Sequence, residues 1–299
     1  MNQQSAISNL QSRDHARAAS RRIAGLLALV TLGLPARAAE PPPLADLLTN
    51  AGTHVRRFEQ DFELVISDED YRQRAGGRMY ISSRQRRTRS EMLFMWLPDE
   101  STWLAVRNVL AVDGRPVPDS QNRLTDRLRD TSAGRVTRLR RLIDESARFN
   151  LGRIYRNINY PTLALAYLDP AMQRRFIFTL AGRERISGID VSKIQFDERE
   201  RPTIIQDEGA DRVSQGAVWV ADEGVVVRTK LDVTIPLRET IASVEVDYRR
   251  DPRLNMWVPA RMHETYLQSR SFMITENIDC VAVYSNFRRF ETSGRLIVR

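Results

Sequence analysis

The stretch from Gln215 to Phe290 constrains the fold of this chain most, because its residues alternate between apolar and polar over long distances. Between residues 225 and 235 the odd positions are apolar except Thr229, while charged or hydroxyl residues occupy most even positions. A period of two places one set of side chains on a buried face and the other in water. At ~3.3 Å per residue such a strand extends roughly 36 Å, well beyond the usual strand of about five or six residues.

Three more runs follow with the same alternation, at 242–248, 256–268 and 278–290, and Asp251-Pro252-Arg253 provides turn residues between two of them. Consecutive strands joined by short turns predict an antiparallel meander. Long strands also twist strongly. We therefore expect an α+β fold with a long, curved, half-barrel-like antiparallel sheet and helices packed on its concave face.

Short alternating runs and turn residues predict more strands before this meander. The first of them, 58–66, is expected to end at an acidic turn, Asp68-Glu69-Asp70. A helical insertion at about 119–169 is predicted to follow, with Gly134 dividing its first part into two helices. We expect residues 39–299 to form a single domain.

Two further helices are predicted on composition and spacing. The run 44–57 has apolar residues at helical spacing, with an acid near its start and arginines near its end. The segment from Pro161 to Asp169 is apolar on nearly all sides, with Pro at its first turn and Pro170 beyond its end. A helix of that composition must be buried, and the concave face of the sheet is the place we expect it to occupy.

Residues 1–38 have the pattern of a targeting segment. A basic region precedes the apolar run 23–34, and Ala36-Arg37-Ala38 matches a small-x-small cleavage pattern. The apolar run is too short for a membrane span, which needs about 20 residues. We expect a periplasmic or secreted protein without a transmembrane span. General secretion is favoured over the twin-arginine route, whose pattern Ser20-Arg21-Arg22 matches weakly.

The net charge of +8 would ordinarily indicate a nucleic-acid or membrane-phosphate partner. Removal of residues 1–38 takes away five arginines and one aspartate, which leaves +4. Of the 46 basic residues only Lys193 and Lys230 are lysines, so the arginine clusters reflect composition more than a chosen surface. No aromatic residues are interleaved with these clusters as base stacking would require. We expect no nucleic-acid partner.

The sequence contains no convincing catalytic or metal-binding pattern. His263-Glu264 begins like a zinc-protease motif, but Leu267 stands where the second histidine is needed. Asp68, Glu69 and Asp70 lack the alternating spacing of a calcium loop. Cys280 is the single cysteine, so no internal disulfide can form, and its neighbours predict a small buried side chain. We expect no metal, no cofactor and no enzymatic activity.

Aromatic and methionine residues on the long strands suit an adaptable apolar pocket. Together with the leucines of the buried helix they form our candidate ligand-binding set. The alternative is that these side chains fill the hydrophobic core and bind no ligand. The candidate residues are Leu163, Leu165, Val227, Leu231, Val233, Val246, Tyr248, Trp257 and Met262.

Several segments carry a resemblance to known proteins. The segments 216–220 (GAVWV), 222–224 (DEG), 257–259 (WVP) and 284–290 (YSNFRRF) resemble a family of uncharacterised secreted bacterial proteins. The order of helix, strand meander, helical insertion and second meander is similar, more remotely, to periplasmic lipoprotein carriers and outer-membrane lipoprotein-sorting proteins. That resemblance implies an incurved half-barrel with helices in its mouth that binds acyl chains. None of the functional residues of the carriers has a match in this chain.

Three functions remain open at this point. The first is a carrier or sensor of a hydrophobic small molecule or lipid. The second is an envelope module that binds another protein through a sheet edge or an arginine-rich face. The third is a hydrolase whose carboxylates meet only in the fold. A cavity between sheet and helices would favour the carrier, and a fully packed interior with an open edge strand would favour the protein-binding module. Two close carboxylates in a cleft would favour the hydrolase.

The targeting pattern generates the first prediction. We expect cleavage after Ala38, so that protein recovered from the cell envelope begins at Ala39. N-terminal sequencing of that fraction checks this, and an intact Met1 there would remove the basis for the periplasmic or secreted assignment.

Overall fold

A computed structural model of the chain describes residues 42–78, 82–97, 102–129, 134–154, 156, 158–207, 209–235, 240–270 and 273–290. The targeting segment expected at 1–38 lies outside these residues. No helix in the described ranges is long and apolar enough to cross a membrane.

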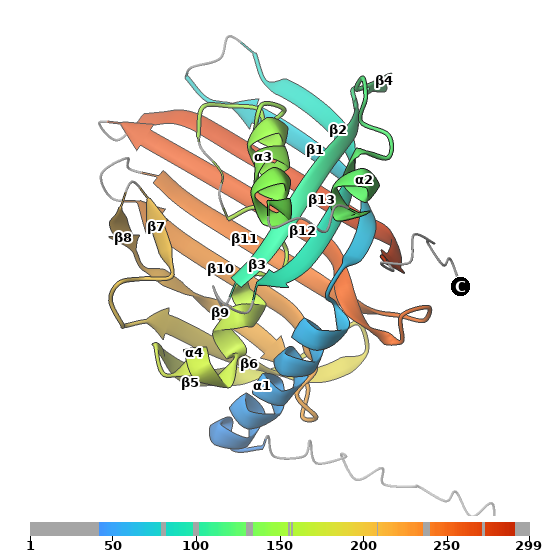
Figure 1. Cartoon of the computed structure of the whole chain (residues 1–299). Coiled ribbons are helices and arrows are strands. Elements are labelled where there is room, and N and C mark those ends of the chain that lie inside the picture. The colour runs from blue at the N-terminus through green and yellow to red at the C-terminus, as the bar shows by residue number, and fades with distance from the viewer. Residues whose placement is uncertain are drawn as a thin grey trace, which may run out of the picture. The chain divides into compact units, whose positions relative to one another are not determined.

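Eleven strands form one antiparallel sheet in the order β4-β3-β2-β1-β13-β12-β11-β10-β9-β6-β5 (Figure 1). β4 and β5 are the two edges, and the sheet is open between them. A separate ribbon pairs β7 (Ile205–Asp207) with β8 (Ala210–Arg212). The strands of the large sheet are β1 Val65–Gly76, β2 Arg84–Leu97, β3 Thr102–Val112, β4 Arg115–Pro116, β5 Phe176–Ile186, β6 Ile189–Glu198, β9 Ser214–Val220, β10 Val226–Ile235, β11 Thr240–Asp251, β12 Met256–Arg270 and β13 Met273–Arg289.

The four strands predicted between 225 and 290 are confirmed as β10 to β13, each paired with the next, and β9, which was not predicted as a separate strand, pairs with β10. The first strand, β1, returns to pair with β13, the last. This pairing joins the N-terminal meander to the C-terminal one in a single sheet. The α+β curved-sheet class expected from the alternation is therefore correct.

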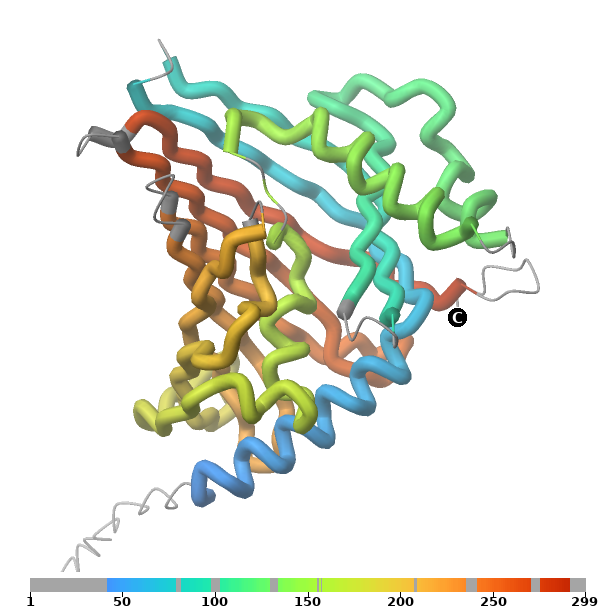
Figure 2. Tube along the Cα trace, turned by 60° about the vertical axis from the view of Figure 1, so that its left-hand side comes forward, coloured from blue at the N-terminus to red at the C-terminus, as the bar shows by residue number. Residues whose placement is uncertain are grey.

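Two helical segments cover one face of this sheet. α1 (Leu44–Asp61) places Leu47, Ala51, Val55 and Phe58 on one buried stripe. A short 3₁₀ helix, η2 (Leu163–Leu168), lies beside α1 and contacts both β3 and β10 (Figure 2). Because β3 and β10 are far apart in the strand order, the sheet must curl around η2. The face that holds η2 is therefore the concave one.

The main hydrophobic core fills this concave side. Phe62, at the end of α1, packs its ring 4.9 Å from Phe94 of β2 and 5.9 Å from Trp103 of β3. Each buried side chain of this size stabilises the fold by about 1.5–3 kcal/mol relative to exposure. The predicted helix at 161–169 is confirmed as a buried element, although it is a 3₁₀ helix that starts at Leu163. α4 (Pro170–Gln173) follows it directly.

The remaining two helices lie elsewhere. α2 (Arg123–Arg129) and α3 (Arg135–Ala147) pack on the opposite face of β1 to β3 (Figure 1). They were expected on the concave face with the others. The reason is that β1, β2 and β3 carry apolar side chains on both faces, so their outer face must also be covered. The residues of this second core are Ile66, Leu93, Met95, Leu104, Val106, Leu124, Leu128, Leu139, Leu142 and Phe290.

The acidic turn expected at Asp68-Glu69-Asp70 is wrong. These residues lie inside β1, and the preceding run 58–61 belongs to α1. Leu64, with a φ of 54°, makes the actual turn between helix and strand. The acidic run is stable in a strand because Asp68 and Asp70 point outward toward arginines, while Glu69 pairs with Arg107 in the interior.

The inward direction expected for Val225 and Val227 is also wrong. A β-bulge between Val226 and Arg228 places Val226 in the main core. Val225 and Val227 instead belong to a small cluster on the other face with Trp219. Beyond the bulge the prediction holds, because Leu231 and Val233 are in the main core. The side chain of Ile235 lies outside the described residues.

The register of β10 generates the second prediction. Leu231→Asp is expected to unfold the protein, because Leu231 is 1% exposed and an unpaired buried carboxylate costs several kcal/mol. The adjacent Lys230→Asp is the matched control. Lys230 is partly exposed and lies 3.5 Å from Asp232, so its replacement should change the free energy of unfolding by about 1 kcal/mol at most. Urea unfolding of both variants checks this, and equal losses would refute the assigned faces.

Candidate functional site

The concave face brings together most of the candidate ligand-binding residues. Leu163 and Leu165 come from η2, and Leu231, Val233, Val246, Tyr248 and Met262 come from β10, β11 and β12. All seven are buried in the main core. The set therefore forms one continuous apolar surface, made of a sheet face and a short helix lying on it.

Two of the candidates lie apart from this surface. Trp257 is partly buried and packs at the margin of both the main core and the small outer cluster. Val227 faces the outer cluster because of the β-bulge described above. We therefore leave Val227 out of the site that the concave face forms.

Hydrogen bonds hold the η2 segment against the sheet. The Tyr248 hydroxyl donates to the carbonyl of Pro161 at 2.7 Å. The Tyr167 hydroxyl lies 3.3 Å from Ser214 Oγ, and its ring stacks on Phe176 at 4.7 Å. Gln173 Nε2 donates to the carbonyl of Leu168 at 2.7 Å. These bonds attach both ends of η2, in addition to the packing of its buried side chains.

A buried ion pair also lies on the concave side of the sheet. The sequence analysis did not predict it. Arg107 of β3 donates to Glu69 of β1 through Nε at 2.6 Å and Nη2 at 2.8 Å. The guanidinium also stacks over the ring of Tyr71 at 4.7 Å. Such a bidentate pair satisfies both charges in a low-dielectric site.

A second arginine enters the interior from the irregular segment between α3 and η2. Arg156 is 5% exposed. Its Nη1 donates to the Tyr71 hydroxyl at 2.8 Å and to Cys280 Sγ at 2.9 Å. Its Nη2 donates to Gln73 Oε1 at 2.8 Å and to the carbonyl of Leu151 at 3.1 Å. Arg156 therefore makes four hydrogen bonds without a direct carboxylate partner among the ion pairs of the described residues.

Glu264 of β12 supplies the nearby negative charge. It is fully buried, and its Oε2 accepts a hydrogen bond from the Tyr266 hydroxyl at 2.7 Å. Burial raises the pKa of the Glu264 carboxyl above its ordinary value, and the positive charge of Arg156 opposes that rise. The strand pairing sets Glu264 opposite Cys280, whose thiol pKa burial raises to about 12. Cys280 is thus buried, as its sequence neighbours predicted, and it also accepts a hydrogen bond from Arg156.

The sequence contained a signal for this polar cluster. Met262, Glu264 and Tyr266 occupy alternate positions of β12, so a buried Met and Tyr place Glu264 on the same inward face. The same holds for Glu69 between Ser67 and Tyr71 in β1. No such rule finds Arg156, because its segment has no period.

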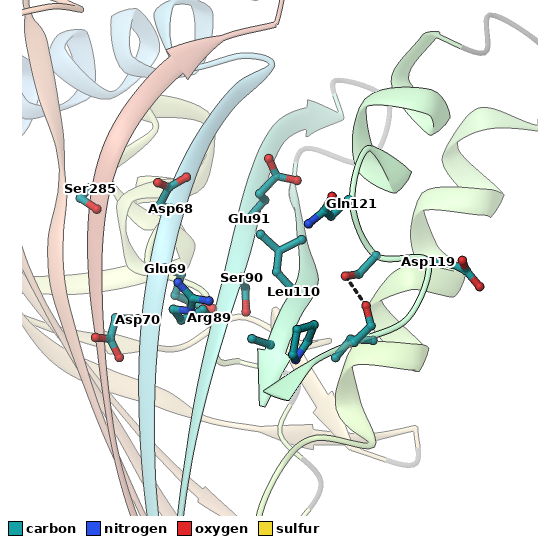
Figure 3. A pocket seen from close by; sticks show the side chains of 14 residues that line it. Asp68, Glu69, Asp70, Arg89, Ser90, Glu91, Leu110, Asp119, Gln121 and Ser285 are labelled. Carbon is teal, nitrogen blue, oxygen red and sulfur yellow. Dashed lines mark hydrogen bonds between the residues drawn. The ribbon is translucent and has the colours of Figure 1, made fainter. Parts of the chain in front are cut away.

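The outer face carries a pocket of about 690 Å³ between the sheet and the loop 116–121 (Figure 3). Asp68 and Glu91 project into it, and both pair with Arg288, at 2.9 Å and 2.7 Å. A smaller pocket of about 330 Å³ lies over β6, β9 and β10. No group of three or more His, Cys, Asp or Glu side chains suited to a metal occurs among the described residues. The geometry of the concave face suits binding, with an apolar surface beside a compact charged cluster.

Comparisons with known proteins give remote likenesses only. No protein-family model matches the sequence, and no curated protein matches it. Among solved structures, a putative outer membrane lipoprotein-sorting protein domain from Vibrio parahaemolyticus is similar at a TM-score of 0.37 and 9% identity, covering 83% of this chain and 92% of that one. A LolA superfamily protein from Nitrosomonas europaea gives 0.31 and 12%, with 83% and 93% covered. A DUF1329 family protein from Desulfovibrio piger gives 0.31 and 13%, with 82% and 94% covered.

These neighbours agree with the remote resemblance to lipoprotein-sorting proteins found in the sequence. At such low TM-scores and identities they carry no argument about the function of this chain. The functional conclusion therefore depends on the residues of the concave face.

One titratable group lies where α1 meets the end of η2. Glu59 of α1 is 8% exposed, and its Oε1 accepts no hydrogen bond from the described residues. Burial first, and then the charge of Asp169, raises the pKa of Glu59 to about 7, while Arg56 opposes the rise. Asp169 in turn caps α4 through the amide of Ala171 at 2.7 Å.

Glu59 generates the third prediction. In the native state Glu59 stays protonated at pH values above its ordinary pKa of 4.5. The native state therefore binds more protons than the unfolded chain up to about pH 7. Stability from this group is therefore present at low pH and is lost as the pH rises through about 7. Glu59→Gln should remove that dependence.

The measurement is urea unfolding of wild type and Glu59→Gln across this range. The difference between the two proteins isolates Glu59 from His54, whose pKa burial lowers to about 4 and which acts with the opposite sign. Parallel curves for the two proteins would show that Glu59 ionises at its ordinary pKa.

Proposed function

We propose that this chain is a non-enzymatic periplasmic or secreted protein that binds a hydrophobic ligand, an acyl chain or lipid, on the concave face of its sheet. η2 is the observation that carries the proposal. All six of its residues are buried, yet a 3₁₀ helix of this length has little stability of its own. Such an element can leave the sheet at low cost only when another apolar group takes its place, because its buried side chains otherwise hold it there.

The exchange of η2 for a ligand is close to balanced in free energy. Leu163, Leu165 and Leu168 present branched alkyl groups to the apolar sheet face. An acyl chain in their place would bury methylene groups worth about 0.8 kcal/mol each. The ligand therefore replaces one set of alkyl contacts with another, and the polar attachments of Pro161 and Tyr167 decide how readily η2 moves.

The compartment follows from the targeting pattern of residues 1–38, which supports export. A carrier needs a surface that is covered when empty, because an exposed apolar face of this size would aggregate in the periplasm. η2 provides that cover.

A second candidate function has one specific observation in its favour. β5 is an eleven-residue edge strand, and Ile177 on it is 52% exposed. Exposed edges of this kind accept an extended segment of another protein. An envelope protein-binding module is therefore the alternative if no ligand binds.

The fourth prediction tests the carrier function with Leu165→Ala. On the carrier account the variant loosens η2, so retention of a fluorescent fatty acyl probe changes with little loss of fold. If Leu165 is only core packing, the variant leaves a cavity that costs about 2–5 kcal/mol and the wild type binds no probe.

Leu139→Ala is the matched control. Leu139 of α3 is as buried as Leu165 but lies in the second core on the opposite face. It should lose stability without any change in probe retention. A wild-type protein that neither binds the probe nor carries lipid by mass spectrometry would end the carrier proposal and leave the protein-binding module.

A further inference from the structure

The polar groups around Arg156 form a receptor built almost entirely from the sheet. Tyr71 and Gln73 come from β1, Glu264 from β12 and Cys280 from β13. These strands are neighbours in the order β1-β13-β12. Arg156 itself lies outside any helix or strand, in the segment that connects α3 to η2. The side chains that surround Arg156 are therefore held by the sheet, whereas Arg156 itself lies on a connecting segment.

The charges of this interior select for a cation. Glu69 and Arg107 neutralise each other as a bidentate pair. Arg156 and Glu264 interact electrostatically without a direct ion pair, and Glu264 Oε1 is buried and accepts no hydrogen bond from the described residues. Without Arg156 the interior would hold one uncompensated carboxylate, which is costly in a low dielectric. A positive group can restore the balance, whereas a carboxylate or phosphate would add to the repulsion.

Aromatic rings add to this preference. The Arg156 guanidinium lies 6.0 Å from the centroid of Tyr71 and 5.7 Å from that of Tyr266. The faces of such rings attract ammonium and guanidinium groups. The Tyr71 hydroxyl and Gln73 Oε1 both accept hydrogen bonds from Arg156, and the Glu264 carboxylate and the ring faces add attraction for a positive charge.

The receptor is continuous with the apolar surface of the proposed site. Across β11 and β12, Glu264 pairs with Val244 and Met262 pairs with Val246, so these side chains share the concave face. A molecule with its tail over Val246 and Met262 would bring its head group to Glu264.

We propose that this receptor is a head-group site for a cationic amphiphile, such as an alkylammonium or alkylguanidinium lipid. Arg156 fills the site in the empty protein, and the positive head group of the ligand fills it in the loaded one. This inference rests on the proposed carrier function and names its ligand class.

The first experiment asks whether the receptor takes a free cation. Arg156→Ala leaves a space of guanidinium shape, and methylguanidinium chloride should raise its Tm by at least about 2 °C over sodium chloride of equal ionic strength. Wild type should show no such gain, because its receptor is full. The double variant Arg156→Ala with Glu264→Gln should also show none, because the selecting charge is gone. Equal effects on all three proteins, or no effect on Arg156→Ala, would overturn the inference.

The second experiment uses the wild-type protein, so it stands even if Arg156→Ala does not fold. Dodecylamine, dodecanoate and dodecanol share one tail length and differ in head group. Dodecylamine should displace the fluorescent acyl probe at a concentration about tenfold lower than dodecanoate does. Glu264→Gln should abolish that preference.

The outcomes separate the two proposals. Equal displacement by all three amphiphiles, or preference for dodecanoate, overturns the cationic head-group site while the carrier function stands. Absence of any probe binding overturns the carrier function and with it this ligand assignment.

Discussion

The need to cover one apolar face of a long open sheet determines most of this structure. Most inward side chains of the strands β9 to β13 are apolar, and such a face is not stable in water. Twist curls the sheet, and α1 and η2 fill the resulting concavity. β1 to β3 are apolar on both faces, so α2 and α3 are needed on the opposite side. The positions of α1, η2, α2 and α3 follow from these two requirements.

The charged cluster in the concavity is the feature that core formation does not require. Burial of two arginines and two glutamates costs desolvation energy that apolar side chains would avoid. Arg107 and Glu69 offset this cost with two short hydrogen bonds. Arg156 and Glu264 do so less completely, because Glu264 Oε1 and Arg156 Nε have no hydrogen-bond partner among the described residues. An incompletely satisfied buried pair beside an apolar surface is the physical basis for assigning this place to ligand binding.

The sequence predicted the strands well because their pattern is local. β12 begins at residue 256 as expected, and the pairing order of the C-terminal meander is as predicted. The face occupied by α2 and α3 was missed, because it depends on the apolar residues that β1 to β3 carry on both faces. The bulge at Val226 coincides with the one apolar residue at an even position between 225 and 235, an interruption that the period-two interpretation did not use. Seven of the nine candidate residues share the concave face, whereas Arg156 was missed because its segment has no repeat.

Native mass spectrometry of the protein recovered from the cell envelope tests the central claim most directly, namely that the concave face holds an amphiphile. The account predicts a non-covalent adduct with the mass of a lipid that bears a positive head-group charge, and release of that lipid when the protein unfolds. A protein that appears only at the mass of the polypeptide would contradict the claim. A bound lipid with a purely anionic head group would contradict the cationic head-group site assigned to Glu264.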